Sequence, residues 1–154
     1  MATKSSAKQV ALVVAAHPDD IEYCMGGTLM MLGRAGWELH YMNLSAGNCG
    51  SAQFDSATTA QKRRTEAQTA AKILGATWHP PLCNDLEIFY EIETLRKLAS
   101  VIRKARPNIV LTHSPEDYME DHMETCRLAV TAAFSKGMPN FKVTPARKPT
   151  DQDI

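Results

Sequence analysis

The sequence predicts an α/β fold in which a mainly parallel sheet carries helices on both faces. Residues 10–16 (VALVVAA) and 108–112 (NIVLT) are apolar, β-branched runs, typical of strands that are buried on both sides. Amphipathic stretches of helical length follow each run. Strands that alternate with helices in this way favour a three-layer α/β/α arrangement.

Periodicity and helix breakers place the elements of the first half. A helix is expected over residues 21–35, and a second strand over residues 38–44 (ELHYMNL), where apolar residues alternate. Gly26 and Gly27 lie inside the helical stretch, where they lower helix propensity and indicate a close backbone approach. Residues 45–56 (SAGNCGSAQFDS) have the composition of a functional loop at the carboxyl end of a strand.

The second half continues the alternation up to residue 134. Gly75 is expected to cap one helix and Pro107 to end another. One domain is expected over residues 8–135, and residues 136–154, with three prolines and little periodicity, are expected to be a loop or a flexible tail. The elements expected in this half are a helix at 57–74, a strand at 76–79, a helix at 91–106, the strand at 108–112 and a helix at 121–134.

Charge and composition argue against several function classes. Lys plus Arg and Asp plus Glu number 17 each, so the net charge is zero and no diffuse field would attract nucleic acid or an anionic membrane. No apolar stretch is long enough to span a bilayer. The four cysteines are far apart and form no CxxC pair, which argues against a structural zinc knuckle. A reducing, cytoplasmic location is therefore expected.

Two clusters of His and Asp residues follow predicted strands. Residues 17–20 (HPDD) come after the first strand, and residues 113–122 (HSPEDYMEDH) after the late one. Because parallel strands bring their carboxyl ends to one edge of the sheet, both loops should face the same crevice. Zinc prefers imidazole nitrogen and carboxylate oxygen as ligands. The first cluster would supply His17 and Asp20, and the Asp-His pair at residues 121–122 a third ligand.

A simpler interpretation competes with a metal site. Asp19 and Glu22 resemble a capping box, and an Asp at a helix start is more often a cap than a ligand. Single histidines such as His40 and His79 are more often packed or solvated than ligated. The metal interpretation depends on two clusters that coincide with two strand ends, and spacing alone leaves the two interpretations evenly balanced.

Residues 16–22 (AHPDDIE) resemble the AHPDDE signature of the LmbE-like (PIG-L) deacetylases, with Ile21 inserted before the Glu. The similarity extends over about residues 10–134. It implies a Rossmann-like α/β/α domain and a zinc-dependent hydrolase that removes the acetyl group from an N-acetylated sugar or sugar conjugate. Further segments similar to the family pattern are the glycine pair 26–27, the RTE segment 64–66 with the preceding arginine, and the pair 121–122.

The resemblance also implies roles for individual residues. His17, Asp20 and His122 would bind Zn²⁺, although iron or cobalt would fit the same ligands. Asp19, beside a ligand but free of the metal, would take a proton from the attacking water and return it to the leaving amine. Asp121, next to the third ligand, is assigned to the catalytic residues.

Substrate contacts are implied in the same way. Arg63 and Asp85 resemble substrate-contacting residues of the family, although Arg63 is equally well interpreted as a solvated charge in a basic run. Many family members carry a His three residues before the last zinc ligand, where this chain has Met119, which cannot donate a hydrogen bond. His113 or Tyr118 is therefore expected to supply the missing donor.

The family's domains generally continue beyond a chain of this length, so the C-terminal part of the sheet is expected to be missing. Unpaired backbone at the sheet edge would favour a homo-oligomer. Two alternatives remain open. Met119 and the early stop favour a zinc-binding but inactive piece of a longer enzyme. A nucleotide-binding module is disfavoured, because no GxGxxG follows the first strand and the two aspartates there would repel a pyrophosphate.

Overall fold

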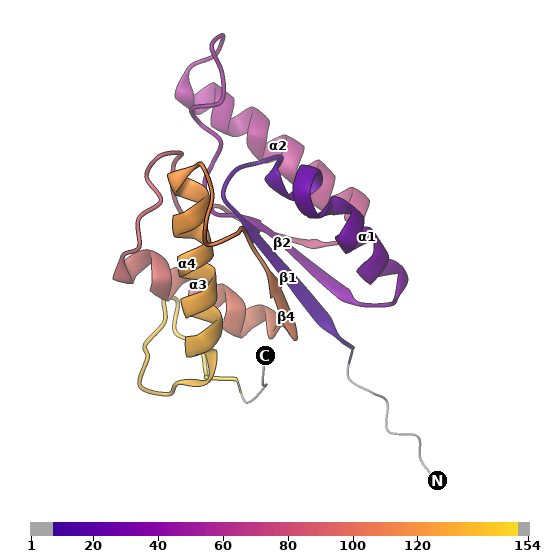
Figure 1. Cartoon of the computed structure of the whole chain (residues 1–154), viewed down its shortest axis with the longest axis vertical. Helices are drawn as coiled ribbons and strands as arrows, with labels where there is room; N and C mark the ends of the chain where they lie inside the picture. Colours follow the sequence, from indigo (N-terminus) through magenta and orange to yellow (C-terminus); the bar gives the residue numbers. More distant parts are fainter. Residues whose placement is uncertain (1–7, 151–154) are drawn as a thin grey trace.

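The computed structural model describes residues 8–150 and confirms the predicted α/β fold. Four parallel strands form one sheet in the order β3-β2-β1-β4. Helices α1 and α2 cover one face, and α3 and α4 cover the other (Figure 1). The elements are β1 (Val10–Ala15), α1 (Gly26–Arg34), β2 (Glu38–Asn43), α2 (Ser56–Leu74), β3 (Thr77–His79), α3 (Ile92–Ala105), β4 (Ile109–Leu111) and α4 (Glu120–Phe134).

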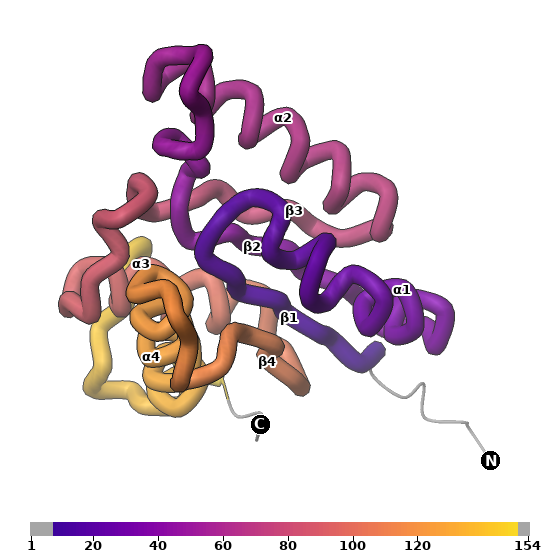
Figure 2. The backbone as a smooth tube through the Cα atoms, turned by 45° about the horizontal axis from the view of Figure 1, so that its top comes forward, coloured from indigo at the N-terminus to yellow at the C-terminus, as the bar shows by residue number. Residues whose placement is uncertain are grey.

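Strand β1 is the centre of the sheet, between β2 and β4 (Figure 2). All of its residues are buried. Leu12 and Val14 pack into the core shared with α3 and α4, whereas Ala11 and Val13 pack against α1 and α2. Because alternate side chains of a strand point to opposite faces, burial on both faces explains why the run is apolar without interruption.

Helix α2 begins and ends at residues that cap it. α2 starts after Asp55, whose side chain accepts the amide of Thr58 at 2.8 Å, and ends at Gly75, which has a left-handed φ of 68°. α3 turns Leu95 and Leu98 toward the sheet. Within residues 8–150, no helix is long and apolar enough to cross a membrane.

The turn after β1 differs from the expected helix start. A π-helix (Ile21–Met25) precedes α1, so the expected single helix is divided. No capping box forms, because the Asp19 carboxylate binds Arg63 and Glu22 accepts the hydroxyl of a tyrosine in β2. A Cβ added at Gly26 or Gly27 would make at most an ordinary van der Waals contact. The prediction of a close backbone approach at this pair is therefore wrong.

The segment after α4 packs against α3. It begins with a short 3-10 helix (Ser135–Gly137) and contains no further helix or strand up to residue 150. The domain boundary at residue 135 stays a prediction, and residues 151–154 of the predicted tail lie outside the described residues. The buried guanidinium of Arg103 holds the segment by donating to the backbone carbonyls of Ser135, Lys136, Met138, Phe141 and Arg147.

Candidate metal centre

The two polar loops that follow β1 and β4 meet at the carboxyl end of the sheet. These strands are neighbours, but β1 leads to a helix on one face and β4 to a helix on the other (Figure 2). Such a switch point is where open parallel sheets bind ligands. Several contacts join the two segments, among them two hydrogen bonds. The amide of Ala16 donates to Nε2 of His113 at 2.9 Å, and Nε2 of His17 lies 2.9 Å from Oδ2 of Asp121.

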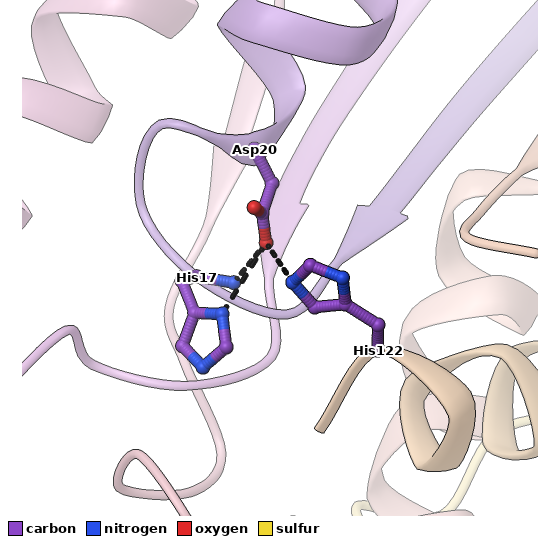
Figure 3. A group of neighbouring side chains, drawn as sticks. All are labelled: His17, Asp20 and His122. Atoms are coloured by element: carbon purple, nitrogen blue, oxygen red, sulfur yellow. Dashed lines mark hydrogen bonds and ion pairs between the residues drawn. The ribbon is translucent and has the colours of Figure 1, made fainter. Parts of the chain in front are cut away.

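His17, Asp20 and His122 converge on one point (Figure 3). Each offers one ligand atom, and these atoms lie within 4.8 Å of one another. Oδ2 of Asp20 is 3.4 Å from Nδ1 of His17 and 3.5 Å from Nε2 of His122. The structure therefore brings together the residues that the sequence singled out as metal ligands.

Nε2 of His122 is a buried atom that has no hydrogen-bond partner among residues 8–150. The other ring nitrogen, Nδ1, lies 3.1 Å from Oδ1 of Asp117, and a proton on Nδ1 would satisfy this contact because a carboxylate only accepts. Nε2 then presents a lone pair toward the Asp20 carboxylate. Two facing acceptors repel each other unless a cation lies between them, so this donor set fits a divalent metal such as zinc.

The two carboxylates control the charge of His17. Burial by itself lowers the pKa of His17, but hydrogen bonds to Asp20 and Asp121 outweigh burial and raise the pKa to about 9. Burial also opposes ionisation of Asp20, yet its close contacts with His113 and His17 hold the pKa of that carboxyl well below its usual range. The cluster therefore favours positive charge at its centre, which a metal cation would supply.

Asp19 lies beside the three converging residues without joining them. It is exposed and has a left-handed φ of 104°, an uncommon conformation for a residue other than glycine. Its Oδ2 lies 2.5 Å from Nη2 of Arg63, whose Nη1 donates to Glu66 at 3.0 Å. The sequence had left open whether Arg63 is a free surface charge, and the structure instead pairs it with the carboxylate of Asp19.

An open hollow of about 360 Å³ leads to the cluster. Asp85, on its lining, accepts hydrogen bonds from the Ser45 hydroxyl and from the amides of Gly47 and Cys49, so it organises the loop after β2. The hollow contains most residues predicted to act on the substrate. Its lining includes His17, Asp19, Asp20, Arg63, Asp85, Tyr118, Met119 and His122.

His113 and Tyr118 differ in their access to this hollow. Tyr118 is 88% exposed and meets the His122 ring edge-on. His113 is buried, and its Nε2 accepts the amide of Ala16, so this nitrogen cannot donate to a substrate. The ring of His113 instead stacks on His122 at a centroid distance of 4.0 Å. The structure therefore argues against His113 as the substitute donor and leaves Tyr118 as the candidate.

Sequence reasoning missed Asp117, which contacts a predicted ligand directly. The signal was its place in the same loop as His122, but a loop does not reveal which of its carboxylates turns inward. The histidines set aside as packed residues are indeed buried. Nδ1 of His40 lies 2.8 Å from Nε2 of His79, and neither lines the hollow.

Comparison with known sequences decides the family. The profile of the GlcNAc-PI de-N-acetylases (PIG-L) matches residues 12–134. The chain belongs to this family. It is 33% identical over 140 residues to a 4-oxalmesaconate hydratase from Pseudomonas putida, covering 86% of this chain and 54% of that protein. A diacetylchitobiose deacetylase from Thermococcus kodakarensis is 33% identical over 136 residues, which are 84% of this chain and 51% of that one.

Solved structures of the PIG-L family have the same fold. An N,N'-diacetylchitobiose deacetylase from Pyrococcus horikoshii superposes with a TM-score of 0.79 at 29% identity, covering 88% of this chain and 53% of that chain. A 4-carboxy-2-hydroxymuconate hydratase from Pseudomonas putida superposes with a TM-score of 0.79 at 30% identity, covering 92% and 62%. The chain thus spans about half the length of the curated relatives it matches.

Proposed function

We propose that this chain carries the metal centre of a zinc-dependent N-deacetylase that acts on an N-acetylated sugar or sugar conjugate. The main support is Nε2 of His122, which is buried without a hydrogen-bond partner among residues 8–150. It faces Asp20 beside Nδ1 of His17. The diacetylchitobiose deacetylases among the relatives support the substrate class.

Three side chains would hold the ion: His17 through Nδ1, Asp20 through its carboxylate and His122 through Nε2. A bound zinc ion would supply Lewis-acid chemistry, polarising the amide carbonyl and lowering the pKa of water to about 7. Asp121 accepts the proton on Nε2 of His17, which leaves Nδ1 of that ring for the metal. We therefore assign Asp121 a positioning role within the predicted catalytic group.

Asp19 is the proposed general base. It lines the hollow beside the ligands, is exposed to water, and is directed by its ion pair with Arg63. Its carboxylate takes a proton from the attacking water as the water oxygen bonds to the acetyl carbon. The same proton passes to the sugar nitrogen as the C–N bond breaks, which releases acetate and a free amine.

The remaining predicted residues would contact the substrate. Arg63 and Tyr118 lie on the lining of the hollow with donor groups. Tyr118 would donate to the acetyl oxygen, a role that Met119 cannot fill. Asp85 already accepts three hydrogen bonds from the loop after β2, and the lone pairs that remain on its carboxylate could accept a sugar hydroxyl.

A hydratase is the second candidate. It is favoured by the identity to the Pseudomonas putida hydratase, which equals the identity to the deacetylase from Thermococcus kodakarensis. Activated water and a base such as Asp19 would serve addition to a carbon–carbon double bond as well as to an amide.

Assays with the zinc-loaded chain test both candidates. Acetate release from N,N'-diacetylchitobiose, absent in the Asp19→Asn variant, would support the deacetylase. Hydration of 4-carboxy-2-hydroxymuconate without acetate release would support the hydratase instead. Zinc binding with neither reaction would contradict both and favour the inactive piece of a longer enzyme.

A further inference from the structure

We propose that Asp117 is a positioning residue, which holds His122 in the tautomer and orientation that leave Nε2 free for the metal. The inference builds on the proposed metal centre but concerns a residue outside the three ligands. His122 would then bind the metal through Nε2, and Asp117 would determine this choice.

A backbone hydrogen bond fixes the carboxylate of Asp117 before helix α4 begins. Its Oδ1 accepts the backbone amide of Met119 at 3.1 Å, which closes a tight turn ahead of the helix. The same Oδ1 lies 3.1 Å from Nδ1 of His122. The acceptor is therefore in place when the first turn of α4 presents the His122 ring.

The surroundings of His122 restrict its ring plane as well. His113 stacks on it with an interplanar angle of 7°, and His113 is itself anchored through Nε2 to the amide of Ala16 in the loop after β1. Stacking fixes the plane of the ring but does not decide which nitrogen carries the proton. The carboxylate of Asp117 supplies that choice, because it accepts only from a protonated Nδ1.

The consequence of losing this carboxylate follows from the burial of the ring. His122 is 7% exposed, so water cannot readily replace Asp117 as the acceptor at Nδ1. A ring without that acceptor gains by placing its proton on Nε2, where it can donate to Asp20. A proton on Nε2 occupies the lone pair that the metal needs, so metal affinity falls.

Two readouts on the full chain test the proposal. Zinc affinity is measured by competition with a chromophoric chelator, and the tautomer of His122 in the metal-free protein is read from the imidazole ¹⁵N shifts. We expect Asp117→Ala to bind zinc about 10- to 100-fold more weakly. Asp117→Asn keeps an acceptor oxygen for Met119 and should lose less. The control Glu116→Gln changes the exposed neighbouring carboxylate and should leave both readouts at the parent values.

The tautomer readout keeps this inference separate from the proposed function. If the parent binds no zinc, the proposed function fails, but the spectrum still decides whether Asp117 holds the proton on Nδ1. The proposal is overturned if Asp117→Ala, still folded by circular dichroism, retains the parent tautomer or the parent zinc affinity. A proton that moves from Nδ1 in this variant, together with weaker zinc binding, supports it.

Discussion

Nε2 of His17 lies 2.9 Å from Oδ2 of Asp121, and the same oxygen accepts the backbone amide of Leu86 at 2.8 Å. Leu86 adopts a left-handed φ of 62° at this contact. One buried carboxylate thus connects the loop after β1, the turn before α3 and the start of α4. Because Asp121 engages Nε2, His17 keeps Nδ1 for the proposed metal.

This relationship predicts that Asp121→Asn weakens zinc binding. The amide oxygen of Asn can still accept from Leu86 and His17, but the negative charge that strengthens His17 as a ligand is lost. We expect zinc affinity to fall by about 10- to 100-fold in a chelator competition. Glu120→Gln, on the exposed neighbouring position, is the matched control. An unchanged affinity in Asp121→Asn would show that the carboxylate does not support the ligand.

Asp19→Asn should abolish most catalysis without removing the metal. Asparagine cannot accept the proton of the attacking water, so kcat should fall by about 10²- to 10⁴-fold while zinc content stays at the parent level. Glu66→Gln is the control, because it removes the other carboxylate that pairs with Arg63 and leaves Asp19 intact. Full activity of Asp19→Asn on N,N'-diacetylchitobiose would exclude Asp19 as the base.

Gly47 and Gly75 form a matched pair for the packing of Arg63. Both have left-handed φ values, 73° and 68°, but an added Cβ meets Arg63 at 2.9 Å only at Gly47. Gly75→Ala should lower the free energy of unfolding by about 1–2 kcal/mol through backbone strain. Gly47→Ala should lower the free energy of unfolding by about 1–3 kcal/mol more than Gly75→Ala does, because the aliphatic part of the Arg63 side chain must move. Equal losses in urea denaturation would mean that Arg63 moves without penalty.

The elements that were predicted correctly from the sequence have local physical causes. Residues 10–16 are apolar at every position because β1 is covered on both faces, and Gly75 ends a helix because it adopts a left-handed φ. The meeting of His17 and His122 was predictable from a general property of parallel sheets, since loops after neighbouring strands share one edge.

The features that sequence reasoning missed depend on contacts between distant residues. The competing interpretation of Asp19 as half of a capping box is wrong, because its carboxylate turns to Arg63, 44 residues further along the chain. The inward turn of Asp117 depends on where α4 presents His122. Arg103 holds the segment after α4 by donating hydrogen bonds to its backbone carbonyls. A pattern of side chains in the sequence does not predict bonds to backbone carbonyls. None of these pairings follows from periodicity or composition.

The buried pair of His40 and His79 predicts an acid-sensitive stability. Burial lowers the pKa of His79 to about 4, and electrostatic interactions with His40 and Lys104 add to this effect. An unfolded His titrates near pH 6.5, so below about 6.5 the unfolded chain binds a proton that the folded chain refuses. The stability contributed by neutral His79 is complete above that pH and is lost as pH falls toward 4.

Thermal melts of the parent and of His79→Gln between pH 7 and pH 4.5 check this expectation. The parent Tm should fall by at least about 4 °C more than that of the variant over this range, since glutamine can accept from His40 but does not titrate. Parallel curves would show that other groups cause the acid sensitivity.

The most direct test of the proposed metal centre is the zinc content per chain, measured by plasma mass spectrometry after zinc loading and removal of excess metal. The parent and His122→Ala are compared, both checked for folding by circular dichroism. If Nε2 of His122 completes the site with His17 and Asp20, the parent will hold about one zinc per chain and the variant less than about a tenth of that. A folded parent without zinc, or equal zinc in both proteins, would contradict the proposed metal centre.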